Sequence, residues 1–172
     1  MRTMFRWLTA FAVLPASPLW AEDSFDDQMR RAKRDVSAHH DELVMVPMRD
    51  GVRLATTIYR PKAIDGGVPA VLWRTPYNEL RLTGERLRFA ASLVERGYAF
   101  VVQNERGKFF SEGEWEILGF PRTDGYDSLT WLADQPWSNG RVGTLGCSSP
   151  AEWQLALAGM NHPAHGAMVP MA

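Results

Sequence analysis

A short segment in the last quarter of the sequence has the residue types of a catalytic turn. Gly146-Cys147-Ser148-Ser149-Pro150 follows an apolar stretch and precedes a segment with helical spacing. A small residue such as Gly146 permits the sharp turn that raises a serine above a sheet at the N-terminus of a helix. Free backbone N–H groups at such a terminus can stabilise an oxyanion. The motif therefore predicts Ser148 as a nucleophile and the N–H of Ser149 as one oxyanion donor.

The same segment allows other interpretations. A Ser-Ser-Pro sequence is also a common way to begin a helix, because proline is tolerated in the first turn. Pro150 stands where the usual Gly-x-Ser-x-Gly pattern has its second glycine. Ser149 is an alternative nucleophile, since Cys147 and Ala151 on either side of it are also small. Cys147 is expected to be a small buried side chain, because the turn points it away from the opening.

Alternating strands and helices are expected around this turn. Asp50-Gly51 is typical of a hairpin turn, so the first two strands should be antiparallel. The later alternation predicts an α/β fold with a mostly parallel sheet after this antiparallel N-terminal hairpin. The predicted strands are 43–48, 52–59, 68–74, 98–103, 141–145 and one that begins at 166. The predicted helices are 83–96, 124–134 and 150–160.

This order of elements determines where a site should lie. The carboxyl ends of parallel strands meet at one edge of the sheet, and ligands bind there in open α/β folds. The segments 75–78, 104–113 and 146–149 should therefore share one edge. Asp127, in the helix before the turn, is expected to cap the helix or form an ion pair.

The N-terminus has the pattern of an export signal. Arg2 and Arg6 precede a short apolar run at 7–14, and the small residue Ala21 follows a helix-breaking stretch. We expect residues 1–21 to be a secretory signal peptide cleaved after Ala21, with Ala16 as the alternative site. The protein should then be periplasmic or secreted. Residues 22–42 are predicted to be a polar lead-in, and no later stretch is long and apolar enough to cross a membrane.

The composition excludes several classes of protein. The 172 residues are 45% hydrophobic and carry a net charge of −1, which argues against a nucleic-acid partner. The sequence has neither Gly-x-Gly-x-x-Gly nor a Walker-type motif, and we expect no cofactor. His162 and His165 lack a third metal ligand nearby, so we interpret them as solvated side chains that follow a helix. The oligomeric state has no signal in the sequence.

An ordered series of short motifs resembles the cocaine-esterase-like (CocE/NonD) hydrolases and their X-Pro dipeptidyl-peptidase relatives. The resemblance covers about residues 43–172 and implies an α/β-hydrolase fold that hydrolyses esters or amides of small molecules or peptides through Ser, Asp and His. It places the nucleophile at Ser148 and the side-chain oxyanion donor at Tyr77. The motifs lie at 46–54, 59–61, 74–77, 106–107, 111–113, 124–127 and 135–143, followed by the turn.

Two local departures from the family pattern concern the turn and one loop. The family usually has Ser-Tyr-x-Gly where this chain has Ser148-Ser149-Pro150-Ala151. It usually has Asp before an Arg-Gly pair, where this chain has Asn104-Glu105 before Arg106. We interpret Arg106 as a residue that shapes its loop rather than as a catalyst.

A larger departure concerns the acid and the base. In this fold they follow the serine along the chain, yet the sequence after Ser148 offers only Glu152, His162 and His165. The helix 150–160 should carry both histidines to the opposite edge of the sheet. We therefore expect residues 43–172 to be the N-terminal portion of a hydrolase domain, truncated after the helix 150–160 that follows the turn. The alternatives are an inactive fragment or a small-molecule-binding module without turnover.

Overall fold

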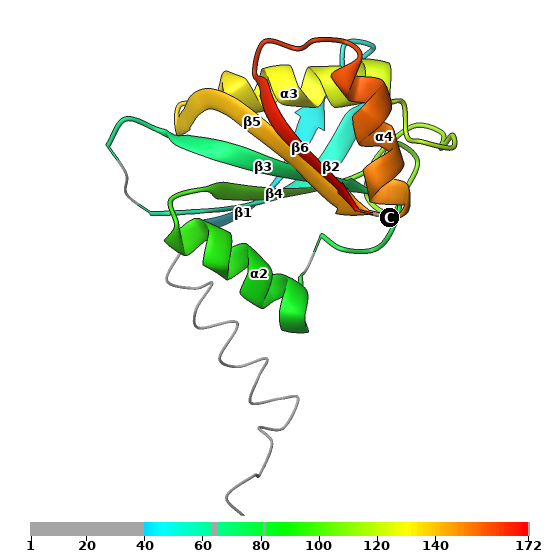
Figure 1. Cartoon of the computed structure of the whole chain (residues 1–172). Helices are drawn as coiled ribbons and strands as arrows, with labels where there is room; N and C mark the ends of the chain where they lie inside the picture. The colour runs from blue at the N-terminus through cyan, green and yellow to red at the C-terminus, as the bar shows by residue number, and fades with distance from the viewer. Residues whose placement is uncertain (1–39, 63–64, 81, 172) are drawn as a thin grey trace, which may run out of the picture.

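The computed structural model describes residues 40–62, 65–80 and 82–171 of the chain (Figure 1). The expected signal peptide at 1–21 and most of the polar lead-in lie outside the described residues. No helix in the described part of the chain is long and apolar enough to cross a membrane. The strands are β1 (His40–Pro47), β2 (Arg53–Arg60), β3 (Val68–Thr75), β4 (Ala99–Asn104), β5 (Ser138–Cys147) and β6 (His165–Met171). The helices are α2 (Gly84–Glu95), a π-helical turn at Pro121–Gly125, α3 (Tyr126–Ala133) and α4 (Ser149–Ala158).

The strands form one mixed sheet in the order β1-β2-β4-β3-β5-β6. β1 and β2 are antiparallel, β2 and β4 are antiparallel, and the pairs β3–β4, β3–β5 and β5–β6 are parallel. Helix α2 covers one face of this sheet, and α3 and α4 cover the other (Figure 1). The predicted α/β architecture, mostly parallel after an antiparallel hairpin, is confirmed.

Strand β4 shows why the central strands are continuously apolar. Ala99 and Val101 pack into the cluster that contains α3 and α4, whereas Phe100 and Val102 pack into the cluster that contains α2. All of these side chains are buried. A strand covered by helices on both faces needs apolar residues at every position, and the alternation of a half-exposed strand is absent.

The largest differences from the predicted boundaries occur at three elements, and the others differ by one or two residues. β1 begins at His40 rather than 43, because it pairs with the whole of β2 up to Arg60. β5 begins at Ser138 and contains a register shift against β3, with Gly140 at a φ of +81°. The predicted helix 124–134 is divided into the π-helical turn and α3, since the chain enters it through Phe120 at a left-handed φ of 52°.

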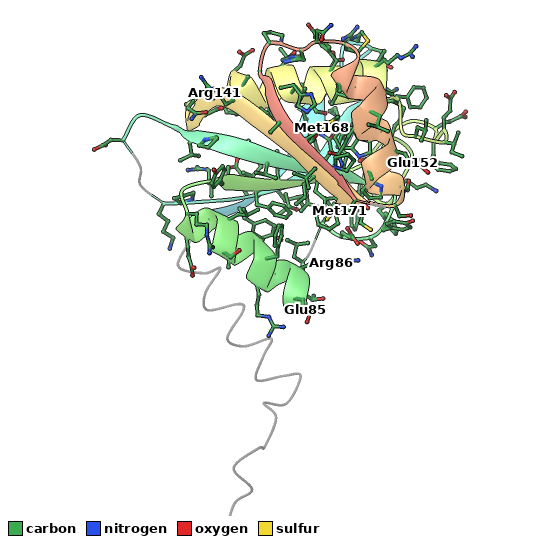
Figure 2. The ribbon with its side chains drawn as sticks, in the orientation of Figure 1. Glu85, Arg86, Arg141, Glu152, Met168 and Met171 are labelled. Carbon is green, nitrogen blue, oxygen red and sulfur yellow. The ribbon has the colours of Figure 1, made fainter. Side chains whose placement is uncertain are left out.

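Strand β6 forms an exposed edge of the sheet. Its side chains Met168, Val169 and Met171 are 40%, 50% and 41% exposed. Figure 2 labels Met168 and Met171 on this strand. Beside it, Val169 borders an apolar groove of about 400 Å³ that extends to Phe89 of α2. An unpaired apolar edge of this kind is a template for intermolecular pairing.

We expect the 172-residue chain to be poorly stable or aggregation-prone by itself, with self-association through β6. Replacing Val169 with lysine should raise the concentration for self-association about tenfold, equivalent to about 1.4 kcal/mol, because a charge on the edge opposes pairing. Sedimentation over a dilution series would measure this change. Leu155→Lys, at a 60% exposed position on α4, is the control. A monomer that unfolds cooperatively at high concentration would contradict the prediction.

Candidate active site

Ser148 lies between the end of β5 and the start of α4 and has an unusual backbone conformation. Its φ is 60° and its ψ is −129°, and the residue is exposed. A non-glycine residue in this region is strained, and such strain persists only where the surroundings hold it. The N–H of Ser148 donates to the carbonyl oxygen of Met171 at 2.9 Å, and its own carbonyl oxygen accepts from Ala151 N–H at 2.7 Å. The neighbouring strand and the helix therefore hold the serine in this conformation from both sides.

Gly146 is required for the turn because the chain folds back closely on it. A Cβ atom at this position would lie 2.4 Å from the carbonyl oxygen of Pro150 and 2.5 Å from the Pro150 Cβ. Neither atom belongs to a flexible side-chain end, so a larger residue would displace the start of α4. The sequence prediction that Gly146 permits a sharp turn agrees with this geometry.

We expect Gly146→Ala to destabilise the chain by about 1–3 kcal/mol, because the added methyl group overlaps the first turn of α4. Chemical denaturation would measure the loss in the free energy of unfolding. Gly166→Ala is the matched control, since a Cβ there meets no atom within 4 Å. Equal effects of the two substitutions would contradict the proposed close approach.

The first turn of α4 supplies the expected backbone donor. Ser149 is the first residue of the helix and Pro150 is the second, so the proline lies where a missing N–H is harmless. The N–H groups of the first turn have no acceptor within the helix itself. The Ser149 N–H is therefore a donor without a partner inside α4, and it lies next to Ser148 at the positive end of the helix dipole.

Cys147 is exposed, which contradicts the expected small buried side chain. It is the last residue of β5, and the strand leaves the covered part of the sheet there. Leu145, which shares a face of β5 with Cys147, is buried, so burial within the strand did not predict the surroundings of its last residue.

Tyr77 lies on the same edge of the sheet as Ser148. β3 ends at Thr75 and β4 at Asn104, and these two residues are paired in register. Leu72 of β3 is in register with Thr144 of β5, and each lies three residues before the end of its strand. The phenol side chain of Tyr77 is 50% exposed, so it is not the packed aromatic that would indicate a purely structural role.

Arg106 shapes its loop, as predicted, by bonding to two carboxylates from other segments. Its guanidinium group donates to Asp124 through Nε at 2.9 Å and Nη2 at 2.7 Å, and to Asp50 through Nη1 at 2.7 Å. These contacts fasten the β1–β2 turn and the π-helical turn to the loop after β4. Hydrogen bonding to Arg106 lowers the pKa of Asp50. Asp127 also forms the expected ion pair, at 2.5 Å with Arg49.

A second set of buried charges lies behind the loops. Burial lowers the pKa of Arg74 and raises that of Glu105, while the opposite charge of each partly offsets the change in the other. Arg74 donates to Gln103 at 2.9 Å and to the carbonyl oxygen of Gly119 at 2.7 Å. Its backbone carbonyl accepts from the indole N–H of Trp153 at 3.2 Å. Trp153 belongs to α4, so this network connects β3 to the helix that follows Ser148.

His162 and His165 lie away from the serine, as predicted. In the register of the parallel strands, His165 pairs with Val142, whereas Met171 pairs with Cys147 at the other end. His162 is only 7% exposed, which corrects the prediction that both histidines are solvated. Its Nδ1 accepts from Ala164 N–H at 3.1 Å, and its Nε2 lies 2.9 Å from the Thr130 hydroxyl. The ring packs against Tyr126 of α3 with a centroid distance of 4.3 Å.

These contacts predict a pH-dependent stability. Burial lowers the pKa of His162 and of His165, so the unfolded chain binds protons that the folded chain does not. The free energy of unfolding should fall as the pH drops below about 6.5, by up to about 1.4 kcal/mol per pH unit for each proton. His162→Gln should reduce this slope between pH 7 and pH 5, measured by urea denaturation. An unchanged slope would show that the His162 proton is not linked to folding.

The described residues thus bring together Ser148, Ser149 and Tyr77 on one edge. The structure places no histidine of its described part beside Ser148, and Glu152 is an exposed residue in the first turn of α4. No group of three or more His, Cys, Asp or Glu side chains that could hold a metal occurs among the described residues.

The sheet order and the strained, exposed serine between a strand and a helix define the chain as part of an α/β-hydrolase. The family model described as X-Pro dipeptidyl-peptidase (S15 family) matches residues 50–172. The chain belongs to this family.

Individual relatives agree with this assignment. The chain is 44% identical over 121 residues to a cocaine esterase of Rhodococcus sp. (strain MB1 Bresler), covering 68% of this chain and 21% of that protein. It is 33% identical over 147 residues to a putative serine esterase of Mycobacterium bovis, covering 73% of this chain and 23% of the relative. Among solved structures, an α-amino acid ester hydrolase is 31% identical with a TM-score of 0.67, covering 94% of this chain and 28% of that one. The chain therefore spans between about a fifth and somewhat more than a quarter of the length of these relatives.

Proposed function

We propose that this chain carries the nucleophile and the oxyanion hole of a serine hydrolase that cleaves esters or amides. The observation that carries the proposal is the backbone of Ser148, at a φ of 60° on an exposed strand–helix junction. Strained backbone conformations of this kind occur at functional sites, where the strain presents a reacting group. A serine that only capped a helix would have an extended backbone and a φ below zero.

The proposed reaction begins with attack by the Ser148 Oγ on the substrate's carbonyl carbon. The hydroxyl proton passes to a base, and the electrons of the C=O double bond move to the oxygen. The Ser149 N–H and the Tyr77 hydroxyl then donate hydrogen bonds to this oxyanion. When the tetrahedral intermediate collapses, the alcohol or amine leaves with a proton, and water later releases the acid from Ser148. The activities named for two relatives, cocaine esterase and α-amino acid ester hydrolase, support an ester or amide of a small molecule as the substrate class.

The base and its acid partner are not supplied by the described residues around Ser148. Without a base, a serine hydroxyl is a weak nucleophile at neutral pH. This observation favours a second candidate for the 172 residues alone, namely a binding module or an inactive fragment that holds a substrate-sized molecule without turnover.

A fluorophosphonate probe distinguishes the two candidates. The serine oxygen attacks phosphorus and fluoride leaves, which adds one phosphonyl group per active site. Intact mass measured on the native protein should show one adduct, and peptide mapping should assign it to Ser148. Protein without an adduct would support the binding module, and an adduct on Ser149 would contradict the assignment of the nucleophile.

We further propose that the protein is exported to the periplasm or the medium. Arg2, Arg6 and the apolar run at 7–14 support this proposal. N-terminal sequencing of the protein from the extracytoplasmic fraction should begin at Glu22. A cytoplasmic protein that retains its first residues would contradict it.

A further inference from the structure

The backbone of Tyr77 is held at three points. Its N–H donates to the Thr75 hydroxyl oxygen at 3.1 Å. Its carbonyl oxygen accepts from the Asn104 side-chain amide at 2.7 Å and from the Glu79 N–H at 2.9 Å. The loop that presents the phenol group is therefore fixed to β3, to β4 and to the residue two positions further along the chain.

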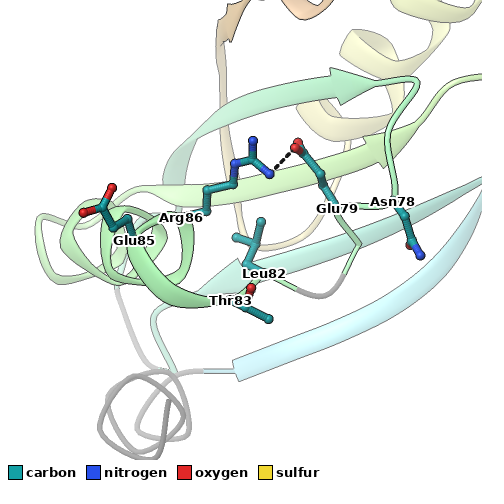
Figure 3. A pocket seen from close by; sticks show the side chains of 6 residues that line it. All are labelled: Asn78, Glu79, Leu82, Thr83, Glu85 and Arg86. Atoms are coloured by element: carbon teal, nitrogen blue, oxygen red, sulfur yellow. Dashed lines mark ion pairs between the residues drawn. The ribbon is translucent and has the colours of Figure 1, made fainter. Parts of the chain in front are cut away.

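The side chain of Glu79 forms a buried link between this loop and α2. Its carboxylate is 6% exposed and forms an ion pair with the Arg86 guanidinium of α2 (Figure 3). The Glu79 N–H donates to the Tyr77 carbonyl oxygen. Glu79 therefore binds Arg86 through its side chain and Tyr77 through its backbone.

The surroundings make this carboxylate costly to bury without these partners. Burial raises the pKa of Glu79, whereas Arg86 and Thr75 lower it. Arg86 also lies over the Trp73 ring of β3, 6.0 Å from the centroid. A polar cavity of about 290 Å³, lined in part by Asn78 and Thr83, opens beside the pair (Figure 3).

We propose that Glu79 is a positioning residue that holds Tyr77 in place for oxyanion stabilisation. This inference rests on the proposed role of Tyr77 and adds a residue that acts through it. The Glu79 N–H holds the Tyr77 carbonyl oxygen, and the Glu79 carboxylate binds the Arg86 guanidinium. The ion pair with Arg86 therefore ties the Tyr77 loop to α2. A displacement of about 1 Å at an oxyanion donor can cost about a hundredfold in rate.

The first measurement tests the link from the Tyr77 loop through Glu79 to Arg86, and it does not require catalysis. Hydrogen exchange of the Tyr77 and Glu79 amides should become about tenfold faster in Glu79→Gln and in Arg86→Gln. Glu85→Gln is the matched control, because the Glu85 side chain is 93% exposed and pairs with Arg88 within the same helix. Arg86→Gln changes the exposed end of the pair, so it reports on this link even if Glu79→Gln fails to fold. Unchanged exchange in both variants would overturn the inference.

The second measurement is a double-mutant cycle with Tyr77→Phe, which reads the rate of Ser148 phosphonylation. Glu79→Gln should slow labelling about tenfold or more in the presence of Tyr77 and should have almost no further effect in Tyr77→Phe. Equal effects in both backgrounds would mean that Glu79 acts on the fold and not through Tyr77, which would overturn the inference. Absence of labelling in the unmodified protein would instead refute the proposed function, and the exchange result would then decide alone whether Glu79 holds the loop.

Discussion

Replacing Ser148 with alanine is expected to abolish labelling by a fluorophosphonate and to lower the rate of ester hydrolysis by about a thousandfold or more. The reason is that the proposed covalent intermediate forms on the Ser148 oxygen, and the proposed oxyanion hole and substrate binding alone would retain only a residual acceleration. Adduct stoichiometry by intact mass and hydrolysis of p-nitrophenyl acetate would measure the two effects.

Ser149→Ala is the matched control for this substitution. It removes a neighbouring hydroxyl but keeps the backbone N–H that is proposed to bind the oxyanion. Labelling should persist in this variant, with a rate within about tenfold of the unmodified protein. Loss of labelling in Ser149→Ala, with retention in Ser148→Ala, would reverse the assignment of the nucleophile.

Replacing Arg106 with methionine is expected to destabilise the folded chain by about 3–5 kcal/mol. Asp124 has no exposed surface, so removing Arg106 leaves a buried carboxylate without its charged partner. The guanidinium also lies over the Phe120 ring at 5.0 Å, and it joins segments that are distant in the sequence. Urea denaturation followed by circular dichroism would measure the loss.

Two comparison variants test whether the loss comes from the buried charge of Asp124. Arg53→Met breaks a more exposed pair, since the side chains of Arg53 and Glu112 are 57% and 39% exposed. That change should cost less than about 1 kcal/mol. In Arg106→Met, a second substitution, Asp124→Leu, should recover part of the loss because it removes the unpaired charge. Equal costs for Arg106→Met and Arg53→Met would show that burial of the pair contributes little.

The predicted elements and the turn at Ser148 could be read from the sequence because their causes are local. Continuous apolar stretches such as 99–102 indicate a strand covered on both faces, and Asp50-Gly51 indicates a tight turn. Gly146 before Ser148 indicates a sharp bend, and the structure contains one at this position. Boundaries were less accurate, as in β1, since pairing with a distant strand extended an element beyond its apolar residues.

The burial of single polar residues could not be read in this way. His162 was expected to be solvated, but Tyr126 of α3 packs against its ring, and Thr130 and the Ala164 N–H are the partners of its two nitrogens. Cys147 was expected to be buried, but it lies where β5 leaves the covered sheet and is exposed. Burial of a polar group depends on whether a partner offsets its lost hydration, and a partner distant in the sequence leaves no local pattern.

The sequence by itself therefore determined the α/β alternation and the strand–turn–helix at Ser148, because short-range periodicity and turn chemistry encode them. The family resemblance rested on the ordered series of short motifs. Only the tertiary structure decided how Glu79 connects the backbone of Tyr77 to Arg86 of α2. It also decided how Arg106 joins Asp50 to Asp124. The physical reason is that β4 inserts between β2 and β3, which brings the loops of different strands to one edge and makes charged residues partners across distant parts of the chain.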